Sequence, residues 1–106
     1  MKYAIDYDLE EVTAQEFEDL CSNALEKKTV ILKYLKSFNA WGYTTEPLSD
    51  KKTGKVVQED GCASYTDGEY EWYDDWIYHF EKYNLKLNDD FIAHVLSKVN
   101  GCDDGR

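Results

Sequence analysis

Acidic and aromatic side chains alternate between residues 56 and 78, and this segment carries the most specific chemistry in the sequence. It contains seven carboxylates and no lysine or arginine. Aromatic residues beside charges are typical of the energetic centres of protein interfaces. The segment therefore predicts a partner-binding surface, or, in the simpler alternative, a solvated strand face above an aromatic core. The predicted contact residues are Asp67, Glu69, Tyr70, Glu71, Tyr73, Asp74 and Asp75.

Other combinations of reactive side chains are weaker. His79 and His94 are the only histidines that could activate a serine or cysteine nucleophile, and no serine lies in a G-x-S-x-G turn. With Cys62 and Cys102 they could supply four zinc ligands, but the spacing matches no zinc pattern. We therefore expect a non-enzymatic protein with no catalytic residue, metal or cofactor, in which both histidines lie at the surface or its rim.

The charge balance restricts the partner. The 106 residues include 22 acidic and 12 basic side chains, which gives a net charge of −10, and the single arginine is Arg106. Such a chain repels nucleic acid and anionic membranes, because both are bound through clustered lysine and arginine. We expect a basic protein partner, although acidic charge can also serve solubility alone.

The cysteines and the N-terminal residues favour the cytoplasm. Cys21, Cys62 and Cys102 are odd in number and widely spaced, which is unlike a disulfide framework. The first residues contain no apolar run, and no segment approaches 18 apolar residues. We expect a soluble cytoplasmic protein with reduced thiols.

The elements that must position the acidic segment begin with a strand and a long helix. Polar and apolar residues alternate over residues 2–9, which predicts a half-buried strand. Thr13 and Glu16 form a capping box, and apolar residues then recur at helical spacing as far as Phe38. We expect one long N-terminal helix, which residues 27–29 could kink.

The rest of the chain predicts strands followed by helices. Short strands separated by polar turns cover residues 40–72, and Asp67-Gly68 predicts a two-residue hairpin loop that places Tyr65 opposite Tyr70. Helices follow over residues 75–83 and from Asn88 or Asp89 to Gly101, and Asn84 ends the first of them. The expected fold is a single α+β domain over residues 1–106. It would have one antiparallel sheet of about four to five strands, the long N-terminal helix packed on it, and two C-terminal helices.

The stretch from Glu71 to Ile92 resembles a pattern of aromatic and helix-capping positions found in small bacterial proteins. Some of those proteins resemble immunity proteins of contact-dependent inhibition and other polymorphic toxin systems. The resemblance covers about the last third of the chain and carries over no functional residues. It implies a cognate toxin domain as partner, often a nuclease.

Three functions follow as hypotheses. The first is an immunity-type inhibitor that binds and neutralises a basic toxin domain. The second is a phage or mobile-element inhibitor of a host nuclease or defence complex, which uses the same physics. The third is a small ligand-binding domain or enzyme, which requires a concave apolar pocket with converging polar groups.

Overall fold

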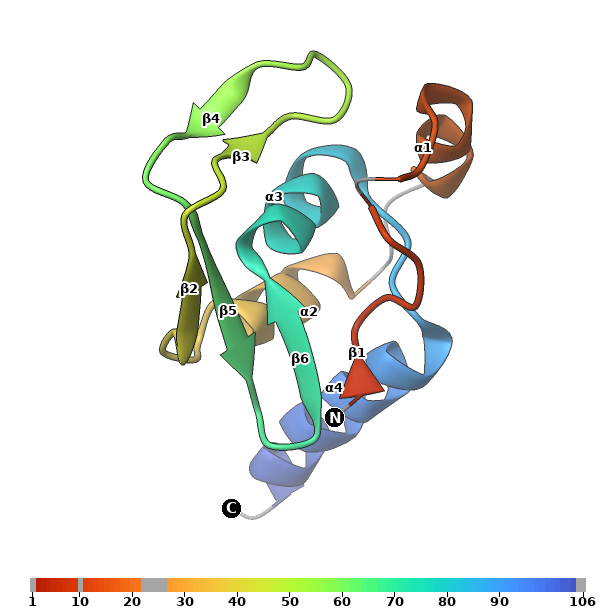
Figure 1. Cartoon of the computed structure of the whole chain (residues 1–106). Coiled ribbons are helices and arrows are strands. Elements are labelled where there is room, and N and C mark those ends of the chain that lie inside the picture. The colour runs from red at the N-terminus through yellow and green to blue at the C-terminus, as the bar shows by residue number, and fades with distance from the viewer. Residues whose placement is uncertain (1, 10, 22–26, 105–106) are drawn as a thin grey trace.

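The computed structural model describes residues 2–9, 11–21 and 27–104, which form six strands and four helices (Figure 1). The strands are β1 (Lys2–Tyr3), β2 (Gly42–Thr44), β3 (Leu48–Ser49), β4 (Val56–Gln58), β5 (Cys62–Thr66) and β6 (Tyr70–Tyr73). The helices are α1 (Ala14–Leu20), α2 (Lys28–Leu35), α3 (Asp74–Tyr83) and α4 (Asp89–Asp104). The α+β class is as expected, but the arrangement of the strands and of the first helix is not.

The strands form two sheets rather than the single antiparallel sheet that we expected. Four of them have the order β1-β6-β5-β2, while β3 and β4 pair as a separate two-stranded ribbon. The larger sheet is mixed, because β1 runs parallel to β6 and the other pairs are antiparallel. The predicted fold was therefore wrong on this point.

The strand predicted over residues 2–9 is reduced to two residues. Lys2 N–H donates to the Glu69 carbonyl and Ala4 N–H to the Glu71 carbonyl, both at 3.1 Å. Ala4 and Ile5 are then buried in the core, so the chain turns away from the sheet. Ala4 and Ile5, which the predicted strand placed on opposite faces, are both buried, so the alternating half-buried strand was wrong.

The long N-terminal helix is also wrong. α1 begins as expected, because the Thr13 hydroxyl accepts from Glu16 N–H at 3.1 Å and the Glu16 carboxylate accepts from Thr13 N–H at 3.0 Å. It ends after seven residues, since Cys21 is extended and forms a β-bridge with Leu85. That tertiary pairing stops the helix although the apolar spacing continues.

α2 resumes the helical pattern at Lys28, which is one of the polar residues 27–29 that interrupt the apolar spacing. Residues 22–26, which the expected helix crossed, lie outside the described residues. α2 buries Ile31 and Leu35, which face the same core as the C-terminal helices. Two short helices thus replace one long one.

The β5–β6 hairpin has its loop one residue later than predicted. Asp67 N–H donates to the Tyr70 carbonyl, so Gly68 and Glu69 form the loop, and Gly68 has a positive φ of 101°. Tyr65 therefore pairs with Trp72 rather than with Tyr70. The register moves by two residues, which keeps Tyr65, Tyr70 and Trp72 on the same face.

The core lies between the sheet and the helices. α2 and α4 lie behind the strands in Figure 1, where Trp72 and Phe91 are fully buried with ring centroids 5.6 Å apart. Trp72 Nε1 donates to the Leu35 carbonyl at 3.1 Å, so its polar atom is satisfied.

α3 ends at Asn84 in the left-handed conformation, as expected. Within the described ranges, no helix has both the length and the apolar character needed to cross a membrane.

Candidate functional site

Asp67, the first residue of the predicted surface, holds the hairpin to the helices. Its Oδ2 accepts from the Tyr34 hydroxyl and lies 2.6 Å from His94 Nε2, while its Oδ1 accepts from the N–H groups of Glu69 and Tyr70. The side chain is almost completely buried. Burial raises the pKa of this carboxyl, but these hydrogen bonds outweigh burial and lower it to about 2. The carboxylate thus serves the fold.

The two glutamates of β6 have different surroundings. Glu69 at the loop is exposed, whereas Glu71 is only 8% exposed. Glu71 lies on the outward face of the sheet, as expected, but β1 pairs along β6 and makes it an inner strand with Tyr3 directly opposite Glu71. Tyr70 faces the core and packs against Phe91 at 5.1 Å. Neither Glu71 nor Tyr70 is therefore an open contact residue.

Asp74 joins the start of α3 to the sheet. Its Oδ2 accepts from Ala63 N–H at 2.8 Å and its Oδ1 from the Tyr65 hydroxyl at 2.6 Å. The bond to Asp74 adds to burial in raising the pKa of Tyr65. The Asp74 carboxylate therefore holds β5 against the start of α3.

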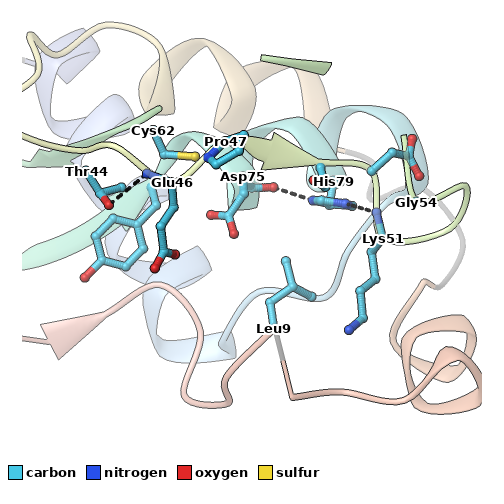
Figure 2. A pocket seen from close by; sticks show the side chains of 12 residues that line it. Leu9, Thr44, Glu46, Pro47, Lys51, Gly54, Cys62, Asp75 and His79 are labelled. Carbon is cyan, nitrogen blue, oxygen red and sulfur yellow. Dashed lines mark hydrogen bonds between the residues drawn. The ribbon is translucent and has the colours of Figure 1, made fainter. Parts of the chain in front are cut away.

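Tyr73 and Asp75 are the two predicted residues that the fold brings to an open cavity. The cavity has a volume of about 650 Å³ and lies between the end of β2, the β3–β4 ribbon and α3. Figure 2 shows the Asp75 and Glu46 carboxylates on one side of it and Leu9 across from them, while the Lys51 side chain extends away. The cavity therefore combines an apolar wall with carboxylate groups.

A second cavity of about 590 Å³ adjoins the first, because both are lined by Leu9, Tyr73 and Asp75. Its remaining wall comes from Trp76, Tyr3 and residues 5–8. We call the two adjoining cavities together the acidic groove. Among the described residues that line it, Lys51 is the sole cation, and the carboxylates are Asp6, Asp8, Glu46, Asp50 and Asp75.

The aromatic side chains of the groove lie among these acids. Tyr73 packs edge-on against Trp76 at 4.6 Å, and Tyr3 packs against the same ring at 6.3 Å. Burial, with the charge of Glu71 acting in the same direction, raises the pKa of Tyr73 to about 12. The Tyr73 phenol therefore stays neutral at physiological pH and presents its ring and hydroxyl group beside negative charge.

Asp50, which the sequence did not single out, fixes the ribbon to α3 at the back of the groove. It is 1% exposed and accepts from the hydroxyls of Tyr78 and Tyr83 at 2.5 and 2.6 Å. The N–H groups of Lys52 and Thr53 donate to its other oxygen at 2.8 and 3.0 Å. Burial opposes the charge, but the four donors hold the pKa of Asp50 well below its usual range. An Asp at the start of a polar turn is the only sequence signal for this role.

His79 is fully buried in the same wall, so the expected surface position was wrong. Lys51 N–H donates to His79 Nε2 at 2.9 Å, which makes that nitrogen an acceptor, and Nδ1 therefore carries the proton and donates to the Asp75 carbonyl at 2.6 Å. Burial lowers the pKa of His79 and keeps it neutral. A general base needs an available lone pair, and here the backbone occupies it.

An exposed aromatic patch lies next to the groove on β2. Trp41 and Tyr43 are 59% and 84% exposed, and β2 is an edge strand of the larger sheet. β2 ends at Thr44 and the chain continues to Glu46, and both residues line the groove. We call Trp41 and Tyr43 the edge aromatics. Sequence reasoning did not single out these two residues, because it could not separate exposed aromatics from those that build the core.

Metal ligation finds no obvious place in the described part of the chain. Among the described side chains, those of residues 2–9, 11–21 and 27–99, no three His, Cys, Asp or Glu are grouped so that they could hold an ion. Cys21 and Cys62 are partly buried thiols, and burial raises the pKa of Cys21.

No family model, curated protein or solved structure matches the chain.

Proposed function

We propose that the protein is a non-enzymatic inhibitor of the immunity type, which binds a cognate basic toxin domain in the bacterial cytoplasm and neutralises it. The observation that carries the proposal is the pair of edge aromatics, exposed on an edge strand of a protein with a net charge of −10. Large aromatic side chains contribute most of the affinity in many protein interfaces. The negative charge favours a basic partner and speeds its association.

Inhibition in this proposal is steric and electrostatic. The edge aromatics anchor the contact, and the acids nearby face the positive surface with which a nuclease domain would hold nucleic acid. Because the steering charge is long-ranged, the association rate falls as salt is added. A phage or mobile-element inhibitor would use the same surface on a different partner, and the genes beside this one distinguish the two.

A co-expression assay tests the proposal. A toxin domain encoded by the gene directly upstream is expressed with the wild-type protein, with Trp41→Ala/Tyr43→Ala, or with the control Val56→Ala/Val57→Ala, which removes exposed apolar groups from β4. We expect growth with the wild type and the control, and loss of protection with the edge variant. An upstream gene without a basic toxin domain, or a toxin that kills despite wild-type protein, contradicts the proposal.

Small-ligand binding is a second candidate, favoured by the larger cavity. Its volume of about 650 Å³ is in the range of ligand pockets, and Leu9, Cys62 and Tyr73 line it beside polar groups. Thermal shifts with a library of small metabolites test this candidate. A shift that Asp75→Asn removes supports it, whereas no shift from any compound counts against it.

A further inference from the structure

We infer that the acidic groove is the docking site for an extended basic segment of the partner protein, whose lysine or arginine side chains enter its two cavities. The inference rests on the proposed function and adds to it the surface and the chemistry of the partner. It moves the contact away from the hairpin loop, where Asp67 is already bound by four groups of the chain itself.

The shape of the groove fits an extended segment. The two cavities adjoin through shared walls, and alternate residues of an extended chain point to the same side. Residues i and i+2 of one segment can therefore occupy both cavities at once. Leu9 contributes apolar surface to each cavity, which suits the methylene stems of long basic side chains.

The chemistry of the walls selects a cation. Asp75 borders both cavities, Glu46 borders the first, and Asp6 borders the second. Tyr3, which is 45% exposed, and Tyr73 present rings on which a guanidinium can stack. Lys51, the sole cation among the described lining residues, extends away from the Asp75 and Glu46 carboxylates (Figure 2).

Charge also decides between possible occupants. A second copy of this chain would bring another net charge of −10 against the same carboxylates, and nucleic acid would bring phosphates. A basic protein segment is the occupant whose charge complements the groove. The edge aromatics on β2 lead into Glu46, so one partner can cover them and the groove together.

The test uses a hexa-arginine peptide as the probe and NMR titration of the full chain as the readout. We expect chemical-shift changes concentrated at Tyr3, Asp6, Tyr73 and Asp75, with little change at the hairpin loop. A hexa-glutamate peptide is the negative control and should leave the spectrum unchanged. Chemical-shift changes spread evenly over all surface acids would overturn the inference, because the peptide would then bind through the net charge of the protein and not through the groove.

Matched variants separate local from overall charge. Asp6→Asn/Asp75→Asn removes two carboxylates from the groove, and Glu18→Gln/Glu69→Gln removes two exposed ones that line neither cavity. We expect the groove variant to weaken peptide binding about tenfold and the control to weaken it less than about twofold. Equal losses in the two variants would overturn the inference.

The co-expression assay keeps this result distinct from the proposed function. If the groove variant loses the peptide but still protects cells as well as the wild type does, the inference fails and the inhibitor proposal stands. If neither the wild type nor the groove variant protects cells, but the peptide binds in the groove of the wild type, the inhibitor proposal fails and the groove remains a cation site. Loss of both peptide binding and protection in the groove variant supports both.

Discussion

Asp50 and Asp67 are two buried carboxylates that accept four hydrogen bonds each, yet they hold two very different regions. Asp67 joins the β5–β6 hairpin, already part of the larger sheet, to Tyr34 of α2 and His94 of α4. Asp50 joins the separate β3–β4 ribbon to Tyr78 and Tyr83 of α3. The same chemistry thus reinforces the core in one place and attaches a peripheral element, the wall of the groove, in the other.

The difference teaches how acidic residues divide between structure and function. Carboxylates that precede a turn, such as Asp50 and Asp67, are bound by nearby N–H groups and by phenols of the helices. Carboxylates away from such donors, such as Asp6 and Glu46, line the groove. Removing each kind of acid should therefore have a different consequence, and the predictions below follow that order.

The largest expected effect is that of Asp67→Ala. The substitution leaves the Tyr34 hydroxyl, His94 and two hairpin N–H groups without their acceptor inside the core. We expect a loss of about 3–4 kcal/mol in the free energy of unfolding, measured by urea denaturation. A loss below about 1 kcal/mol would mean that water satisfies these groups and that the hairpin needs no such tie.

A smaller and more local effect is expected for Asp50→Ala. The ribbon can move away from α3 and let water reach Tyr78 and Tyr83, so we expect a loss of about 2–3 kcal/mol. Hydrogen exchange should accelerate at Lys51, Lys55 and Val56 while Tyr65 and Trp72 in the hairpin stay protected. Equal acceleration in both regions would contradict the separation between ribbon and core.

Sequence reasoning predicted locally determined features well and long-range pairings poorly. The Thr13 capping box and the Asn84 helix end were found because neighbouring residues determine them, whereas the β5–β6 loop was predicted one residue too early. The parallel pairing of β1 with β6 was not found, because it joins residues about 70 apart and has no local signature. The buried roles of Glu71 and His79 follow from that pairing and from the ribbon, so the site could not be located before the fold.

The pH dependence of stability sharpens the comparison. Burial keeps His79 neutral in the native state, so the unfolded chain binds its proton first and stability falls as the pH drops below about 6.5, the ordinary histidine pKa. Asp67 has a native pKa of about 2 against 3.8 for an unperturbed carboxyl, so its contribution is complete above about 4. It is lost between about pH 4 and 2 and amounts to about 2 kcal/mol.

Chemical denaturation between pH 7 and about pH 2 measures both stages. We expect His79→Gln to flatten the stability curve near pH 6, and Asp67→Asn to flatten it below pH 4. Because protonation of Asp50 also weakens the ribbon, Asp67→Asn should leave part of the acid loss in place. A stability that is constant from pH 7 to about pH 2 in the wild type would contradict the buried, charged state of both aspartates.

The smallest expected effect is that of Glu69→Lys, two residues from Asp67 in the same hairpin. Glu69 is exposed, and its carboxylate lies 3.8 Å from both His94 Nδ1 and Lys98 Nζ, so it makes only loose ion pairs. Such pairs contribute little, and we expect a loss of no more than about 0.5–1 kcal/mol in the free energy of unfolding.

The neighbouring change Glu71→Lys should lower the free energy of unfolding by more. Glu71 is 8% exposed on an inner strand, so a lysine there must be buried or displace β1. Urea denaturation of the two single variants measures the contrast. Since both substitutions change the net charge equally, similar losses would show that overall charge, and not the position of β1 beside β6, determines how this hairpin tolerates a cation.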